Sequence, residues 1–128
     1  MLDHLGFPVS DYARAKAFYE TALKPLGYGL IMEATPEQTG EGYACGFGPE
    51  GRAQFWIAEG GAPDKHLHIA FAAKSRAEVR AFYEAALAAG ARDNGPPGVR
   101  EIYHPTYYGA FVLDPDGHNI EAVCHAPD

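Results

Sequence analysis

The sequence predicts an α+β fold made of two copies of one module, each with a strand, a helix and three further strands. Two observations predict it: the chain repeats itself at a spacing of 64 residues, and each copy changes from strand-type to helix-type periodicity. Nine of the twenty residues in 4–23 are identical to their counterparts in 68–87, where about one or two identities are expected by chance. We therefore expect one domain of 128 residues with two tandem repeats, about 1–62 and 65–125.

Each copy opens with an apolar strand. Residues 2–9 are short and apolar, and residues 66–71 alternate with period two. The second of these strands would place Leu67, Ile69 and Phe71 on one face and its two histidines on the other.

A helix follows each opening strand. The first would begin at Ser10 or Asp11 and end near Gly27, and the second begins with a capping box in residues 75–78 and ends at Gly90. The apolar face of the first helix consists of Ala15, Phe18, Tyr19, Ala22, Leu23 and Leu26.

Turn residues divide the remainder of each copy into three strands. In the first copy the expected strands lie near 29–32, 42–47 and 53–58, with a polar loop over 35–42. In the second copy they lie at 101–103, 108–113 and 119–124, after a stiff loop over 92–98 and with an Asp-Pro-Asp-Gly turn at 114–117.

Composition excludes several classes of partner. The chain has 17 acidic and 10 basic residues and a net charge of −7, which argues against nucleic acid or an anionic membrane surface. It has neither an apolar run long enough for a membrane span nor the pattern of a signal peptide, so we expect a cytoplasmic protein. Cys45 and Cys124 lie in apolar stretches and are expected to be reduced, partly buried thiols.

Three residues are candidate metal ligands. His4 and His68 occupy equivalent positions in the two copies, and Glu121 lies in the apolar final strand. A carboxylate is costly to bury there unless it is paired or bound to a metal. Two imidazoles and one carboxylate form the facial triad that divalent metals use. The alternative is two hydrogen-bonded structural histidines and a surface glutamate on an edge strand.

A second cluster contains Tyr103, His104, Tyr107 and Tyr108. These side chains could line a substrate pocket, with His104 and Tyr108 as candidates for an acid or an orienting group. They could equally cap a sheet edge or a dimer interface.

Aromatic residues of the first copy could extend such a pocket. Phe47 and Trp56 would add apolar wall suited to a planar or aromatic ligand, although Trp56 fits a core position equally well. His66 could support His68 or be solvated, His118 is expected to be exposed in its turn, and His125 is given no role.

Three segments together resemble the vicinal oxygen chelate superfamily, which includes glyoxalase I, bleomycin-resistance proteins, fosfomycin-resistance thiol transferases and extradiol dioxygenases. They are residues 3–11 with Phe18-Tyr19 in the helix behind, residues 66–71, and residues 111–121 around the Asp-Pro-Asp-Gly turn. The resemblance implies paired βαβββ modules that form a cupped mixed sheet around a metal site, and a homodimer. It also implies that His4, His68 and Glu121 are metal ligands, which suit Fe, Mn, Ni, Zn or Co.

The chain departs from glyoxalase I at one ligand. Glyoxalase I has a carboxylate where the alignment puts Trp56, which can neither bind a metal nor shuttle a proton. Gln54 lies on the same strand face, but its use as a ligand needs a shifted alignment. A site with three protein ligands resembles the dioxygenases and the transferases, although no basic cluster here suits a phosphonate.

The resemblance implies a small divalent-metal-dependent enzyme whose small-molecule substrate chelates the metal through neighbouring oxygens. A lyase or isomerase and an iron dioxygenase are both open, and Trp56 weighs against the first. One alternative is a metal-free dimer that binds a small molecule, as bleomycin-resistance proteins do. Another is a scaffold in which the triad is a relic. Whether the site lies within one chain or is shared by two is also open.

Overall fold

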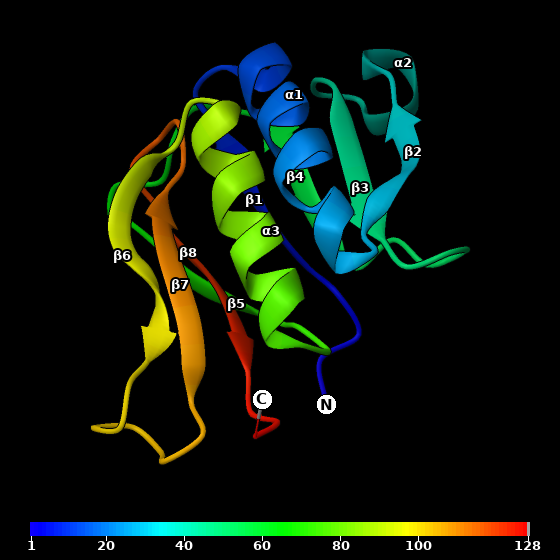
Figure 1. The fold of residues 1–128 in the computed structure, drawn as a ribbon. Coiled ribbons are helices and arrows are strands. Elements are labelled where there is room, and N and C mark those ends of the chain that lie inside the picture. The colour runs from blue at the N-terminus through cyan, green and yellow to red at the C-terminus, as the bar shows by residue number, and fades with distance from the viewer. Residues whose placement is uncertain (128) are drawn as a thin grey trace.

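The computed structural model describes residues 1–127, which form two βαβββ modules (Figure 1). The first module contains β1 (Leu5–Val9), α1 (Tyr12–Ala22), the 3-10 helix η1 (Lys24–Leu26), β2 (Gly29–Ala34), the short helix α2 (Pro36–Thr39), β3 (Ala44–Gly48) and β4 (Phe55–Glu59). The second contains β5 (His68–Ala72), α3 (Arg76–Ala88), β6 (Arg92–Val99), β7 (Tyr108–Leu113) and β8 (Asn119–Cys124). The predicted α+β class and the order of elements are confirmed.

Both modules build the same four-stranded mixed sheet. The strand orders are β1-β4-β3-β2 and β5-β8-β7-β6, and in each sheet the first two strands are parallel while the others are antiparallel. Asp11 caps α1 and Ser75 caps α3, each accepting a hydrogen bond from the backbone N–H three residues later. The capping residues therefore set where each helix leaves its opening strand.

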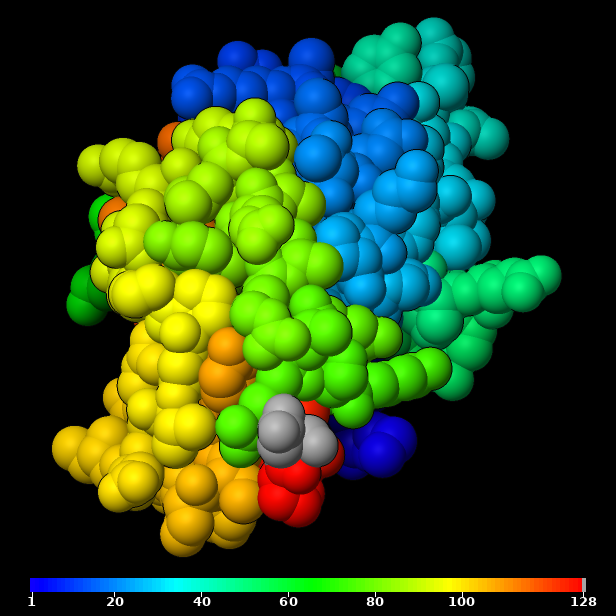
Figure 2. All heavy atoms as spheres, viewed as in Figure 1, coloured from blue at the N-terminus to red at the C-terminus, as the bar shows by residue number. Residues whose placement is uncertain are grey.

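Helices α1 and α3 lie side by side between the two sheets (Figure 1). The space-filling view shows their atoms meeting without a gap along the face turned to the viewer (Figure 2). Apolar side chains from one face of each sheet and from the two helices form the core. The opposite face of each sheet, which we call its open face, carries the alternate residues of every strand. No helix among the described residues is both long and apolar enough to cross a membrane.

Two sequence expectations about the second module are wrong. Residues 92–99 form strand β6 instead of a loop, and residues 101–103 lie in a turn instead of a strand. Proline and glycine normally interrupt strands, but β6 is the edge strand of its sheet, where missing N–H donors are tolerated. Its pairing with β7 is interrupted by bulges, one beside Gly95, whose φ is 146°. The opening strands also begin later than expected, at Leu5 and His68.

Candidate functional site

Glu121 is a buried carboxylate on the open face of the second sheet. It pairs with Ala70 in β5 and with Phe111 in β7, and it is only 1% exposed. Its neighbours in β8, Ile120 and Ala122, point into the core, so alternation puts Glu121 on the other face. Such a burial needs polar partners, and the carboxylate has two, His68 and Tyr107.

His68 presents a ring nitrogen to this carboxylate. Its Nε2 lies 3.2 Å from Oε1 of Glu121, and its Nδ1 lies 3.2 Å from the carbonyl oxygen of Asn119. A carbonyl oxygen can only accept, so Nδ1 must carry the proton of that hydrogen bond. In a neutral imidazole the lone pair of Nε2 then faces a carboxylate oxygen. A cation between them, either a proton or a metal ion, is needed to make this contact favourable.

The same pair fits a divalent metal. Imidazole nitrogen and carboxylate oxygen bind such ions at about 2.0–2.2 Å, so two of them at a right angle around one ion lie about 3 Å apart. The observed separation is 3.2 Å. The ring of His68 is also stacked on that of Phe111, with centroids 6.3 Å apart and planes 21° apart. The Asn119 carbonyl and Phe111 therefore hold the imidazole in an orientation that a metal ligand requires.

Tyr107 forms a hydrogen bond with the other carboxylate oxygen of Glu121. Its hydroxyl donates a hydrogen bond to Oε2. Burial, followed by this hydrogen bond, raises the pKa of Tyr107 above its usual range. The hydroxyl therefore stays protonated at neutral pH and remains a donor.

The third predicted ligand lies apart from this pair within one chain. His4 precedes β1, its side chain is 62% exposed, and its Nδ1 is 2.9 Å from Oδ1 of Asp3. This contact lowers the pKa of Asp3. In residues 1–127 no three His, Cys, Asp or Glu side chains come together as a metal site. One chain thus brings together two of the three predicted ligands, His68 and Glu121.

The Tyr-His cluster is split by the fold. Tyr107 contacts Glu121, whereas Tyr108 points to the helix-covered face, where its ring lies 4.9 Å from the guanidinium of Arg76. Tyr103 is exposed, and its ring centroid is 5.0 Å from that of Tyr107. Nδ1 of His104 accepts the backbone N–H of Thr106. Only Tyr107 among these four reaches the predicted ligands.

Trp56 takes the place in the first sheet that Glu121 takes in the second. Trp56 pairs with Gly6 and Gly46, just as Glu121 pairs with Ala70 and Phe111. A Cβ added to Gly46 would lie 2.8 Å from Cε2 of Trp56, so the half-buried indole rests directly on that glycine. The alignment of Trp56 with a ligand position therefore agrees with the strand register.

Phe47 does not share this open face. It is fully buried in the core, with its ring centroid 6.3 Å from that of Phe55. Neighbouring residues of a strand face opposite sides, and Gly46 is the residue under the indole. Phe47 is therefore a core residue of this chain, not part of a pocket wall.

His118 is buried as well, in contrast to the exposed position expected from its turn. It is 0% exposed, and its Nδ1 accepts the backbone N–H of Leu67 at 2.9 Å. Its own backbone N–H donates to Asp114 at 2.8 Å. His118 thus joins the entry to β5 to the turn before β8, the two strands that carry His68 and Glu121.

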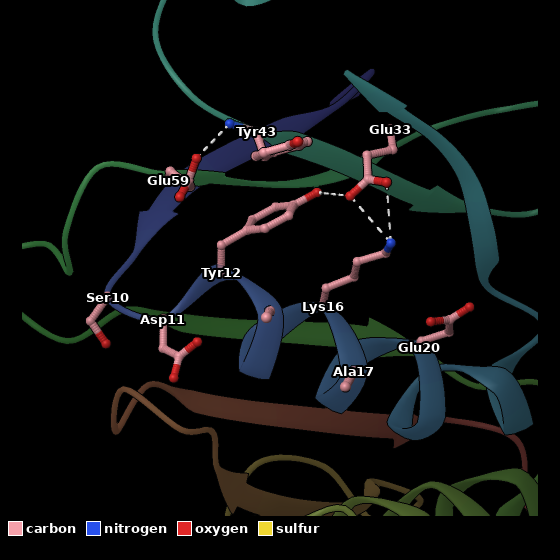
Figure 3. Close-up of a pocket in the computed structure, with 10 residues that line it drawn as sticks. Ser10, Asp11, Tyr12, Lys16, Ala17, Glu20, Glu33, Tyr43 and Glu59 are labelled. Atoms are coloured by element: carbon pink, nitrogen blue, oxygen red, sulfur yellow. Dashed lines mark hydrogen bonds and ion pairs between the residues drawn. The ribbon is translucent and has the colours of Figure 1, made fainter. Parts of the chain in front are cut away.

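A hollow of about 830 Å³ lies elsewhere, between α1 and strands β2 to β4 (Figure 3). In it the hydroxyl of Tyr12 donates to Glu33 at 2.6 Å, and Nζ of Lys16 lies 3.2 Å from the same carboxylate. These two donors lower the pKa of Glu33. The rings of Tyr12 and Tyr43 are stacked beside them. The predicted site residues are not among those that line this hollow.

Comparisons with known proteins agree with this fold. A family model for the Glyoxalase/Bleomycin resistance protein/Dioxygenase superfamily matches residues 1–122. A glyoxalase/bleomycin resistance protein from Albidiferax ferrireducens is 29% identical over 97% of this chain and 98% of its own, with a TM-score of 0.76. A mutant of the fosfomycin resistance protein FosX from Listeria monocytogenes, complexed with Mn(II) and a dihydroxypropylphosphonic acid, is 22% identical over 96% of this chain and 88% of its own, with a TM-score of 0.68.

A glyoxalase I mutant from Zea mays is 23% identical, and the match covers 99% of this chain and 45% of the maize chain, with a TM-score of 0.66. A comparison with curated protein sequences gave no match.

Proposed function

Because the chain belongs to the Glyoxalase/Bleomycin resistance protein/Dioxygenase superfamily, we propose that it is a divalent-metal-dependent enzyme whose small substrate chelates the metal through neighbouring oxygens. One observation carries the proposal: Nε2 of His68 and Oε1 of Glu121 face each other at 3.2 Å. The Nδ1–H of His68 donates to the Asn119 carbonyl, so Nε2 carries no proton in the neutral ring. This is the arrangement of a histidine–carboxylate pair that is ready for a cation.

The proposed metal site is completed by His4 of a second copy of the chain. Within one chain His4 lies apart from the pair, and the two open faces lie on opposite sides of the helix layer. A twofold dimer can place the open face of one copy's first sheet against the second sheet of the other, forming two identical sites. The contact between Nδ1 of His4 and Asp3 supports this role, because a carboxylate on Nδ1 leaves Nε2 as the ligand atom.

The residues around this site have separate tasks. His68 and Glu121 would hold the metal, and Tyr107 occupies the remaining oxygen of Glu121. When bound, the metal would act as a Lewis acid that stabilises negative charge on the substrate oxygens. Trp56 can supply no proton acceptor in the position where a second carboxylate would stand. The site therefore favours chemistry that depends on polarised oxygens over a glyoxalase-type proton transfer between carbons.

Elemental analysis tests the proposal. Protein purified without chelator or affinity-tag metal should contain about one equivalent of a transition metal per chain, and His4→Ala and Glu121→Ala should each lose it. Iron would direct activity assays to oxygen uptake with catechol-like substrates, and nickel, zinc or manganese to isomerisations and thiol adducts. Absence of metal, even after reconstitution with each of these ions, would refute the proposal.

Mixing the two variants tests whether the site is shared. Consider a dimer with shared sites in which one chain carries His4→Ala and the other carries Glu121→Ala. One site then contains both substitutions, and the other contains neither. Co-expression of the two variants should therefore restore metal to roughly a quarter of all sites, because about half of the dimers are mixed. A site built within one chain predicts no restoration.

A second candidate function, a metal-free dimer that binds a planar small molecule, is favoured by Trp56. Its indole lies on the open face over Gly46 and offers a ring surface where a ligand carboxylate would otherwise stand. This candidate predicts ligand binding that persists in His68→Ala and Glu121→Ala but is lost in Trp56→Ala. Metal loss together with activity loss in the first two variants would exclude it.

A further inference from the structure

We propose that Tyr107 is a positioning residue that makes Glu121 a one-oxygen metal ligand. The inference rests on the proposed function, because it assigns a task toward the metal that His68 and Glu121 would hold. The starting observation is that the two carboxylate oxygens have different partners. Oε1 faces His68, and Oε2 accepts the hydroxyl of Tyr107. With Oε2 engaged, only Oε1 is directed to the position that His68 also faces.

Gly109 makes room for this contact. A Cβ added there would lie 3.1 Å from Cε1 of Tyr107 and 3.2 Å from Oε2 of Glu121, tighter than nine in ten real Cβ contacts. The backbone at this position is not in the left-handed region, so the need for glycine is one of space and not of conformation. A side chain at 109 would therefore press on both the Tyr107 ring and the Oε2 atom that accepts its hydroxyl.

The chain around Tyr107 is held in place independently of Glu121. The Arg100 N–H donates to the Tyr107 carbonyl at 2.7 Å, and the Tyr107 N–H donates to the His104 carbonyl at 3.0 Å. The ring of Tyr107 contacts that of Tyr103 on one side and that of His125, 5.3 Å away and nearly perpendicular, on another. Because these contacts fix the ring, the hydroxyl meets Glu121 without a large loss of side-chain entropy at the moment a metal binds.

Fixing a ligand in advance has a measurable effect on metal affinity. Removal of a hydrogen-bond partner of a metal ligand typically weakens metal binding by about 10–100-fold. Without the Tyr107 hydroxyl, the carboxylate can rotate and offer both oxygens or neither. We therefore expect two changes in Tyr107→Phe: weaker binding and an altered coordination geometry.

The test uses Co(II) and the full-length protein in its native oligomeric state. Titration calorimetry gives the Kd, and the visible absorption of the Co(II)-loaded protein reports coordination. Tyr107→Phe and Gly109→Ala should each raise the Kd by about 10–100-fold and shift the Co(II) spectrum. Tyr83→Phe is the matched control, because it removes a hydroxyl that donates to another carboxylate, Asp93, at 3.0 Å. It should change neither quantity.

The outcomes separate the two proposals. If wild type binds Co(II), His68→Ala does not, and Tyr107→Phe matches wild type in Kd and spectrum, the positioning role is refuted while the proposed function stands. If wild type binds neither Co(II) nor any of the ions used for reconstitution, both are refuted. Thermal unfolding of the metal-free variants controls for folding. A loss of affinity in Gly109→Ala with unchanged metal-free stability would support the role even if Tyr107→Phe failed to fold.

Discussion

The hydroxyl of Tyr19, in helix α1, donates a hydrogen bond to the carboxylate of Asp114, in the turn between β7 and β8. Both residues are buried. The other oxygen of Asp114 accepts the N–H groups of Asp116, at 2.9 Å, and His118, at 2.8 Å. Burial, followed by the charge of Asp114, raises the pKa of Tyr19, so its hydroxyl stays a donor. This contact joins the helix of the first module to the turn that leads into Glu121's strand.

Tyr19→Phe should lower the free energy of unfolding by about 1–3 kcal/mol, because a buried carboxylate loses one of its donors. Urea unfolding measures the change. Tyr28→Phe is a suitable comparison, since the Tyr28 hydroxyl donates to the neutral, partly buried Gln54 at 2.7 Å and its loss should cost less. An equal or larger effect at Tyr28 would contradict the importance given to the Asp114 contact.

The buried His118 leads to a second stability prediction. His118→Ala should cost about 2–4 kcal/mol, because it leaves the Leu67 N–H without an acceptor and opens a cavity beside Phe7, whose ring lies 5.2 Å away. His118→Asn, whose side-chain oxygen can accept from the same N–H, should recover part of the loss. Chemical denaturation of both variants checks this. Wild-type stability in His118→Ala would mean that the histidine is not a packing element.

Glu33 predicts a pH-dependent contribution to stability. Hydrogen bonds from Tyr12 and then Lys16 lower its folded-state pKa below the ordinary value of 4.5. As the pH falls, Glu33 therefore becomes protonated in the unfolded state before it does so in the folded state. Its contribution to the free energy of unfolding is complete above about pH 4.5, and it is lost as the pH falls through the lower folded-state pKa. Glu33→Gln should accordingly be less stable than wild type at pH 7, and the difference should shrink in acid.

Urea unfolding of wild type and Glu33→Gln at pH 7 and pH 3.5 measures this. Glu84→Gln, at an exposed position on α3, is the control and should follow wild type at both pH values. A difference between Glu33→Gln and wild type that is the same at both pH values would show that the carboxylate charge is not responsible.

Local patterns in the sequence were sufficient for the modules and their helices. The identities between 4–23 and 68–87 located both β–α units, and the caps at Asp11 and Ser75 are local signals that the structure confirms. The edge strand β6 was missed because its four Gly and Pro residues are typical of a loop, and only its position at the sheet edge makes them acceptable in a strand.

Contacts between distant segments could not be read from the sequence in the same way. His118 is buried because Leu67, 51 residues earlier, lies beside it, and nothing in the turn sequence indicates this. Tyr107 and Tyr108 are adjacent yet face opposite sides of one sheet, so their proximity in sequence gave the wrong picture of a shared pocket. The grouping of His68 with Glu121 was accessible, because their residue types suit a metal and because the chain resembles a family that uses these positions, and the β5–β8 register then places both on one face.

Trp56 provides the last prediction, which rests on the proposed shared metal site. In the first sheet Trp56 holds the register position that Glu121 holds in the second, and it pairs with Gly6 and Gly46 on the two strands beside it. A carboxylate at 56 would lie on the open face of the first sheet, whose opening strand directly follows His4, and would add a fourth ligand to the three proposed. Trp56→Glu should therefore bind Zn(II) or Co(II) at least about 10-fold more tightly than wild type.

Trp56→Gln is the control for this prediction. It loses the same indole packing over Gly46 without adding a carboxylate, so it should not show this gain. Equal Kd values for the Glu and Gln variants, measured by calorimetry, would mean that position 56 does not reach the metal.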